Sequence, residues 1–84
     1  MDELKISIKS PEKEIFSGTA ISVSSKNSTG KFDVLPGHAN LITVIENNPI
    51  VIRQKNGTHQ DFTFDLAIMY VASNQINIYT NINL

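Results

Sequence analysis

Apolar and polar residues alternate along most of this chain, beginning with Leu4, Ile6 and Ile8, which single polar residues separate. A period of two is typical of a strand that turns one face to a core and the other to water. Comparable short runs predict further strands over residues 15–16, 19–25, 32–35, 41–45, 50–53, 60–64, 68–72 and 76–80. No window of about ten or more residues has the apolar spacing of three and four that an amphipathic helix requires.

The pattern therefore predicts an all-β chain whose strands are separated by turn residues every few positions. About eight to ten short strands with this spacing are typical of a β-sandwich or a barrel. We expect an antiparallel β-sandwich in two sheets. A chain of 84 residues has room for one modest core, so we expect a single domain over residues 1–84.

Several short segments predict where the chain turns and which strand is buried on both faces. Pro36-Gly37 suits the central positions of a type II turn, and Asn56-Gly57 is a strong hairpin signal between two strand-like runs. Ser17-Gly18 predicts a tight corner or bulge that separates residues 15–16 from the next strand. Residues 41–45 form an uninterrupted apolar or β-branched run, which predicts a strand covered on both faces.

Composition narrows the class of partner. Seven basic residues against eight acidic ones give a net charge of −1, without the basic excess that nucleic-acid binding needs. The absence of cysteine excludes disulfides, thiolate zinc sites and cysteine nucleophiles. No apolar run approaches the roughly 18–20 residues of a membrane span, and the acidic start does not resemble a signal peptide. These features predict a soluble, intracellular chain.

Candidate catalytic side chains are few. His38 and His59 are the two histidines, and neither lies in a nucleophile-elbow pattern or at metal-ligand spacing. Asp61 and Asp65 favour a solvated strand edge over a catalytic carboxylate pair. The sequence has no glycine-rich phosphate loop. We therefore expect no enzymatic activity, no cofactor and no metal site.

The segment Leu35–Leu41 stands out because a rigid turn, a histidine and small residues lie between two apolar strands. One interpretation is a well-built turn that carries a surface histidine. The other is a fixed turn at one end of the sandwich, presented to a partner protein. The residue pattern alone favours the first.

This region resembles the amino-terminal β-sandwich of the epsilon subunit of the rotary F-type ATP synthase, called delta in mitochondria. Residues 30–41 read GKFDVLPGHANL, against the family's Gly-Glu-aromatic-Gly-Val-Leu-Pro-Gly-His-Ala-Pro-Leu stretch. Residues 10–18 read SPEKEIFSG and match the family's Pro-Glu-x-x-hydrophobic-Phe-Ser-Gly motif. Residues 50–57 and 70–78 are similar to its central and closing hairpins. The resemblance therefore covers nearly the whole chain.

The sequence departs from the family pattern at a few positions. Lys31 stands where the family usually has an acid, and Asp33 where it usually has glycine, so the charge of the exposed loop differs. Leu66-Ala67 replaces a Gly-Gly pair and allows bulkier packing. Most members continue into a carboxy-terminal domain of two helices, which we expect this chain to lack. The resemblance therefore assigns neither inhibition of ATP hydrolysis nor ATP binding to these residues.

The resemblance implies a mechanical, non-catalytic task. The family member lies in the rotor between the central gamma stalk and the c-ring, where it helps pass ion-driven rotation to the catalytic head. Gamma and the c-ring are therefore the expected partners. The expected location is peripheral, on the cytoplasmic face of a bacterial inner membrane, in preference to a mitochondrial or plastid one. The expected partner contacts are Thr29, Gly30, Lys31, Asp33, Pro36, Gly37 and His38.

The alternative function is a free-standing β-sandwich module that binds protein or carbohydrate. Such a module presents a row of exposed aromatic side chains or an open, flat edge strand. The aromatic residues of this chain are Phe16, Phe32, Phe62, Phe64, Tyr70 and Tyr79. Their strand positions suit core and cross-strand packing better than a binding platform.

Overall fold

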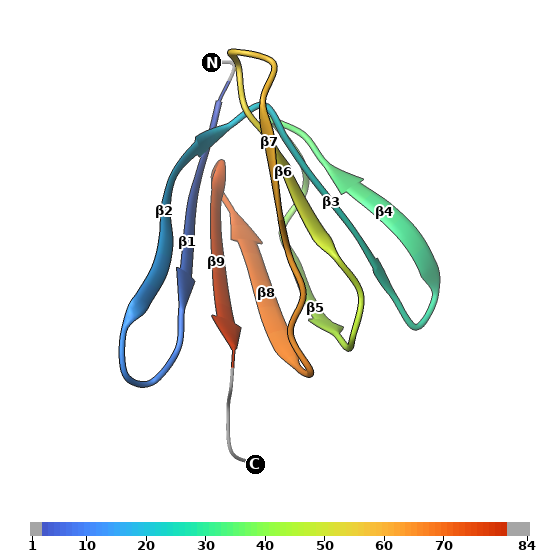
Figure 1. Ribbon diagram of the computed structural model, residues 1–84. Helices are drawn as coiled ribbons and strands as arrows, with labels where there is room; N and C mark the ends of the chain where they lie inside the picture. The colour runs from blue at the N-terminus through green and yellow to red at the C-terminus, as the bar shows by residue number, and fades with distance from the viewer. Residues whose placement is uncertain (1–2, 81–84) are drawn as a thin grey trace.

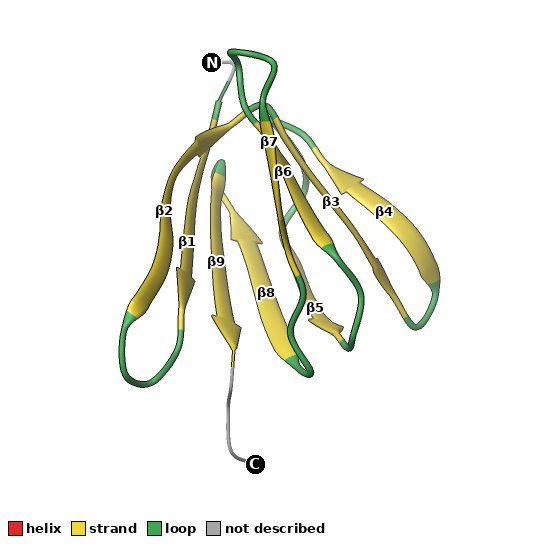
Figure 2. Cartoon of the chain, in the orientation of Figure 1, coloured by secondary structure: helices red, strands yellow, loops and turns green. Residues whose placement is uncertain are grey.

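The computed structural model describes residues 3–80, and this part of the chain consists of β-strands joined by turns and loops, without a helix (Figures 1 and 2). The strands are β1 (Leu4–Lys9), β2 (Glu14–Ala20), β3 (Ser22–Asn27), β4 (Gly30–Val34), β5 (Leu41–Ile45), β6 (Ile50–Arg53), β7 (His59–Phe62), β8 (Ala67–Ala72) and β9 (Gln75–Thr80). The all-β prediction is confirmed. The predicted single domain includes residues 1–2 and 81–84, which lie outside the described residues.

The strands form two sheets that face each other (Figure 1). Sheet A is five-stranded in the order β2-β1-β9-β8-β5, and sheet B is four-stranded in the order β4-β3-β6-β7. All neighbours pair antiparallel except β1 and β9, which are parallel, with Ile6 opposite Ile76. These two strands come from opposite ends of the described chain. No hairpin turn joins them, so none imposes the antiparallel direction.

The core lies between the two sheets and takes every second residue of the strands. In β1, Leu4, Ile6 and Ile8 are all buried, while Lys5 and Lys9 are exposed. Burial of one such side chain stabilises the fold by about 1.5–3 kcal/mol. The other buried apolar residues are Ala20, Val23, Val34, Ile45, Ile50, Ile52, Ala67, Met69, Val71, Ile76 and Ile78. The alternation in the sequence therefore identifies the core face correctly.

Two polar side chains enter the core, and each has a hydrogen-bond acceptor there. The Ser25 hydroxyl donates to the Pro49 carbonyl at 2.9 Å, and the Thr80 hydroxyl donates to the Leu66 carbonyl at 3.1 Å. A buried hydroxyl without a partner destabilises a protein by about 1–3 kcal/mol. Both bonds tie a strand to a neighbouring loop.

Two of the predicted turns are confirmed. The His38 amide donates to the Leu35 carbonyl at 3.0 Å, and Gly37 has φ of 87°, as a type II turn with Pro36-Gly37 at its centre requires. The Asn56-Gly57 hairpin joins β6 to β7, with the Gly57 amide donating to the Gln54 carbonyl at 3.0 Å. Gly57 follows the central pair of that turn, at φ of 90°.

The corner predicted at Ser17-Gly18 is wrong. Strand β2 runs without interruption from Glu14 to Ala20, with Gly18 opposite Ile6, so the predicted strand over 19–25 is divided at Ile21 instead. A Cβ at residue 18 would lie 3.2 Å from the Phe16 ring. This glycine therefore makes room for an aromatic side chain on the same face of the strand, a known use of glycine in sheets.

The prediction that residues 41–45 are covered on both faces is also wrong. Strand β5 is at the edge of sheet A and alternates like the others. Ile45 is 1% exposed, whereas Ile42 is 70% exposed and Val44 is 46% exposed. A β-branched run has the same appearance whether one face or both are covered, so the sequence could not distinguish the two cases.

Candidate interaction surfaces

The β3–β4 hairpin places Thr29 and Gly30 at one end of the sandwich. The side chain of Asn27 fixes this turn, because its Oδ1 accepts from the Thr29 amide at 3.0 Å and from the Thr29 hydroxyl at 2.8 Å. Its Nδ2 donates to the Thr43 hydroxyl of β5 at 2.9 Å. One amide side chain therefore holds the turn and connects sheet B to sheet A.

Lys31 and Asp33 lie within strand β4, on the outer face of sheet B. The Asp33 carboxylate accepts a hydrogen bond from the Ser24 hydroxyl, which in turn accepts one from Arg53 Nη1 at 3.0 Å. These three side chains come from the adjacent strands β4, β3 and β6. Asp33 is therefore engaged by its own sheet. Lys31 is exposed beside the hairpin turn.

The turn at Pro36, Gly37 and His38 follows the other end of β4. The Gly37 amide donates to Oδ1 of Asn74 at 2.7 Å, which ties this turn to the β8–β9 turn. Nδ1 of His38 donates to the Ala39 carbonyl at 2.6 Å. The turn is thus held by one hydrogen bond to the β8–β9 turn and by one within its own loop.

The structure does not bring the predicted contact residues onto one surface. Thr29 and Gly30 lie where β4 begins and the Pro36-Gly37 turn follows its other end (Figure 1), and five residues of strand span about 17 Å. The residues fall into two groups, which we call the hairpin end (Thr29, Gly30 and Lys31) and the Pro-Gly end (Pro36, Gly37 and His38). Their role as partner contacts stays a prediction.

The outer face of sheet A carries an apolar patch that the sequence did not predict. Register places Ile42 beside Tyr70, and Val44 beside Ile68 and then Tyr79. The tyrosine rings lie 5.7 Å apart at an interplanar angle of 80°, and each residue is 40% exposed. An exposed apolar area of this kind often marks a protein contact. The patch follows from the edge position of β5 in sheet A. That position depends on the order of the strands, which the sequence pattern does not give.

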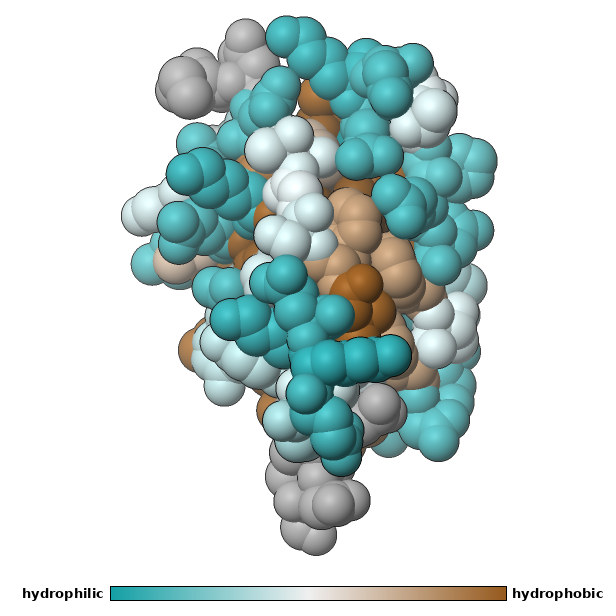
Figure 3. Space-filling view, turned by 60° about the vertical axis from the view of Figure 1, so that its left-hand side comes forward, coloured by the Kyte–Doolittle hydropathy of each residue, from teal (hydrophilic) through white to brown (hydrophobic). Residues whose placement is uncertain are grey.

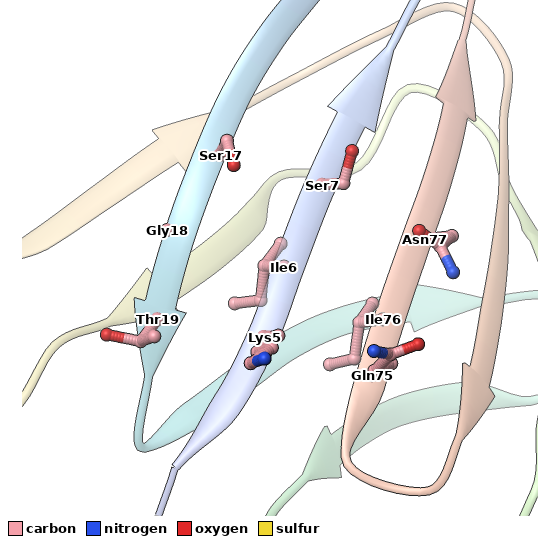
Figure 4. Close-up of a pocket in the computed structure, with 9 residues that line it drawn as sticks. All are labelled: Lys5, Ile6, Ser7, Ser17, Gly18, Thr19, Gln75, Ile76 and Asn77. Carbon is pink, nitrogen blue, oxygen red and sulfur yellow. The ribbon is translucent and has the colours of Figure 1, made fainter.

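A shallow polar groove of about 360 Å³ occupies the other half of the same face, across β2, β1 and β9 (Figure 4). Lys5, Ser7, Ser17, Thr19, Gln75 and Asn77 contribute its polar side chains. The Ser7 hydroxyl is buried and has no hydrogen-bond partner among residues 3–80. The groove offers donors and acceptors for polar contact, and Lys5 is the one titratable side chain in its lining, which includes neither a histidine nor a carboxylate.

Phenylalanine side chains gather where β2 and β7 form the free edges of the two sheets. The rings of Phe16 and Phe62 are 5.6 Å apart, and those of Phe62 and Phe64 are 6.3 Å apart and nearly parallel. All three are partly buried against the core. Figure 3, which brings this side forward, shows apolar side chains in the middle of the face with hydrophilic ones around them. These rings close the side of the core.

The sequence and the fold both have counterparts among known proteins. Residues 3–82 match the family model described as ATP synthase, Delta/Epsilon chain, beta-sandwich domain. The chain belongs to the ATP synthase delta/epsilon family. The resemblance inferred from residues 10–18 and 30–41 is therefore confirmed.

Curated bacterial relatives within this family are named ATP synthase epsilon chain. The relative from Xanthomonas oryzae pv. oryzae (strain MAFF 311018) is 35% identical over 78 residues, which cover 93% of this chain and 56% of that protein. The relative from Campylobacter fetus subsp. fetus is 33% identical over 76 residues, covering 90% of this chain and 59% of that protein. The chain thus spans less than two thirds of the length of these relatives.

Solved structures share the fold at low sequence identity. A chain in the cryo-EM structure of the Euglena gracilis mitochondrial ATP synthase, OSCP/F1/c-ring, aligns with a TM-score of 0.87 at 12% identity, over 95% of this chain and 51% of that one. A chain in the Tetrahymena thermophila mitochondrial ATP synthase central stalk and c-ring structure aligns with a TM-score of 0.74 at 18% identity, over 92% and 62% of the two chains. The family's β-sandwich is thus the fold observed here.

Histidine and carboxylate side chains are scattered over the described residues of this family member. Across residues 3–80, no group of three or more His, Asp or Glu side chains is arranged to hold a metal ion. Nε2 of His59 lies 3.9 Å from a carboxylate oxygen of Asp61, and both side chains are exposed. The part of the chain that the structure describes also contains no helix long and apolar enough to cross a membrane.

Proposed function

We propose that this chain is a non-catalytic rotor subunit of an F-type ATP synthase, which joins the gamma subunit to the c-ring so that proton-driven rotation is coupled to ATP synthesis. The observation that carries this proposal is the family match over residues 3–82. The epsilon-chain names of the bacterial relatives support it. So does the likeness to chains solved within c-ring assemblies.

The two-ended arrangement of the predicted contacts suits a subunit held between two partners. We assign the hairpin end, with its exposed Lys31, to the polar loops of the c-ring. The Pro-Gly end then faces gamma. Each end has a hydrogen-bonded turn, fixed by Asn27 at one and by Asn74 at the other. Because the core between them is close-packed, a load applied at one end reaches the other with little deformation.

A non-catalytic role agrees with the surfaces of the described residues. His38 lies in the loop between β4 and β5, and His59 lies in β7. The groove on sheet A contains neither histidine. Catalysis by a nucleophile requires a base within hydrogen-bond reach. We therefore place ATP synthesis and hydrolysis in other subunits of the complex.

The proposed location follows from the partners. The chain is held at the cytoplasmic face of a bacterial inner membrane through gamma and the c-ring, as a peripheral component. The bacterial origin of the curated relatives supports this location. On this proposal, membranes stripped of the ATP synthase do not retain the chain.

The experiment that tests the proposal is co-purification with the cognate gamma subunit and c-ring. The tagged chain is expected to retain gamma in low and moderate salt, and to show no ATP hydrolysis alone. An unrelated β-sandwich domain with the same tag serves as the control. A chain that never retains gamma contradicts the proposal, as does ATP turnover by the purified chain.

A free-standing carbohydrate-binding module is less well supported. Such a module stacks sugar rings on a row of exposed aromatic side chains, whereas the exposed pair here, Tyr70 and Tyr79, meets at 80°. The four phenylalanines pack against the core. The aromatic residues therefore do not make a flat binding platform.

A further inference from the structure

Two lysines face each other across the β3–β4 hairpin. Register places Lys26 of β3 directly opposite Lys31 of β4, and both are exposed. They lie on the outer face of sheet B, because their neighbours Ser25 and Phe32 point toward the core. Like charges at directly opposed positions destabilise an antiparallel pair. The hairpin therefore holds two positive charges where folding alone would favour a different pair.

The nearest acidic residue on this face does not neutralise them. Asp33 lies two positions along β4 from Lys31, but its carboxylate is engaged by the Ser24 hydroxyl, which also accepts from Arg53. Among the described residues, no carboxylate oxygen lies within 4.0 Å of either lysine nitrogen. Neither lysine is therefore paired with a carboxylate of its own sheet, and the exposed Glu46, from the loop after β5, lines a separate hollow with Asn27 and Ser28.

The two lysines border a hollow of about 230 Å³ whose other lining residues include Asn48, Pro49 and Val51. Pro49 and Val51 supply apolar surface. The Asn48 amide is already engaged, because its Nδ2 donates to the carbonyls of Lys26 at 3.2 Å and Glu46 at 3.0 Å. The hollow therefore combines a fixed backbone with largely apolar surface, to which the side chains of the two lysines contribute. An aspartate or glutamate side chain, with a short apolar stem and a charged head, has the matching chemistry.

We propose that Lys26 and Lys31 together bind a carboxylate side chain on an exposed loop of the c-ring. This inference rests on the proposed function and adds to it a second residue, Lys26, and the charge of the partner group. Binding replaces the repulsion between two like charges with two charge-assisted hydrogen bonds to one acceptor. Residue 31, which is usually acidic in this family, is a positively charged lysine here. The proposal therefore requires an acidic residue on the ring.

The number and setting of the charges favour a protein carboxylate over an anionic lipid surface. Lipid recruitment uses clusters of about four to eight Lys or Arg residues, whereas this site has two. The net charge of −1 adds no general attraction to an anionic membrane. The small hollow also accommodates a single side chain rather than a membrane surface.

The cognate ring sequence gives the first test. The proposal requires an aspartate or glutamate in a ring loop that reaches the hairpin end. A ring whose exposed loops on that side contain no acidic residue overturns it. Where such a residue is present, its replacement by lysine is expected to restore binding of the double variant Lys26→Glu/Lys31→Glu, and failure to do so counts against direct pairing.

Binding measurements give the second test, with the cognate gamma–c-ring complex in detergent as the probe. Lys26→Glu and Lys31→Glu are each expected to weaken binding about tenfold or more, which corresponds to about 1.4 kcal/mol. The control Lys9→Glu makes the same charge change at an exposed position of β1 in sheet A, outside both the hairpin end and the Pro-Gly end, and is expected to stay within about twofold. Added salt is expected to weaken the wild-type chain more than the double variant.

The isolated chain gives an internal check on folding. Lys26→Glu places an acid opposite Lys31, so its melting temperature is expected to equal or exceed that of the wild type while its binding falls. A melting temperature well below wild type overturns this explanation of the binding loss. Lysine-dependent flotation of the chain with phosphatidylcholine–phosphatidylserine vesicles overturns the protein partner in favour of lipid.

The outcomes separate this inference from the proposed function. If the wild-type chain does not associate with the gamma–c-ring complex, the proposed function fails. If it associates and both lysine variants bind as Lys9→Glu does, the proposed function stands and only the carboxylate site is rejected.

Discussion

At the scale of single residues, backbone conformation decides what the Pro-Gly end tolerates. Gly37 has φ of 87°, and a Cβ added there would have no heavy atom within 4 Å beyond its chain neighbours, so a side chain meets strain rather than a clash. We expect Gly37→Val to lower the free energy of unfolding by about 1–2 kcal/mol or more. Urea unfolding followed by circular dichroism measures this change.

The control for that substitution is Ala39→Val, two residues along the same loop, where φ is not positive. It is expected to change the free energy of unfolding by less than about 0.5 kcal/mol. On the proposed function, Gly37→Val also reduces proton pumping in reconstituted vesicles. Equal stability of the two variants contradicts the argument from backbone strain.

The hairpin end depends on one amide side chain. Asn27→Ala removes acceptors for the Thr29 amide and hydroxyl and the donor to Thr43, so we expect a loss of about 1–3 kcal/mol of stability. Faster hydrogen exchange at the Thr29 amide is expected as well. The neighbouring exposed substitution Ser28→Ala is the control. An exchange rate at Thr29 that does not change shows that the amide is protected by something else.

At the scale of the strand, β5 offers a matched pair of isoleucines. Ile45 is 1% exposed and Ile42 is 70% exposed. Ile45→Ala is expected to lower the free energy of unfolding by about 2–5 kcal/mol. Ile42→Ala is expected to lower it by less than about 1 kcal/mol. Denaturant titration of the two variants tests the assignment of faces, and similar losses in both contradict it.

The strands were predictable from the sequence where one face is polar, as in β1 and β9, because the period of two identifies both strand and core face. The failures have physical causes outside the local pattern. Gly18 is explained by the Phe16 ring, and the exposure of Ile42 by the edge position of β5. Neither the parallel β1–β9 pair nor the opposition of Lys26 to Lys31 follows from the pattern, because both depend on register.

The candidate site was predictable only in part for the same reason. The type II turn at Pro36-Gly37 follows from local residue preferences, and the family resemblance indicated which segments to consider. Sequence proximity suggested one surface for residues 29–38. A strand lies between the two turns, however, and separates them to opposite ends of the sandwich. The hydrogen bonds from Ser24 to Asp33 and from Arg53 to Ser24 depend on three strands meeting side by side.

At the scale of the whole molecule, β9 is the strand on which sheet A depends, because it lies between β1 and β8. A chain shortened to end at Asn74 loses Ile76 and Ile78 from the core. It also loses the hydrogen-bonded pairing of β9 with β1 and with β8. We expect this shortened chain to show no cooperative unfolding transition in denaturant. A chain shortened to end at Thr80 retains every described strand and is the control. A cooperative transition in the shorter chain contradicts this view of the sheet.

The side-by-side placement of β1 and β9 (Figure 1) also has a consequence for biosynthesis. Strand β1 emerges from the ribosome before the other described strands, and it finds its parallel neighbour only after β9 has emerged. Until then Ile6 and Ile8 have an incomplete ladder, and the nascent polypeptide exposes one side of its future interior. On the proposed function, docking onto gamma and the c-ring is therefore expected to follow translation of residue 80 rather than accompany it.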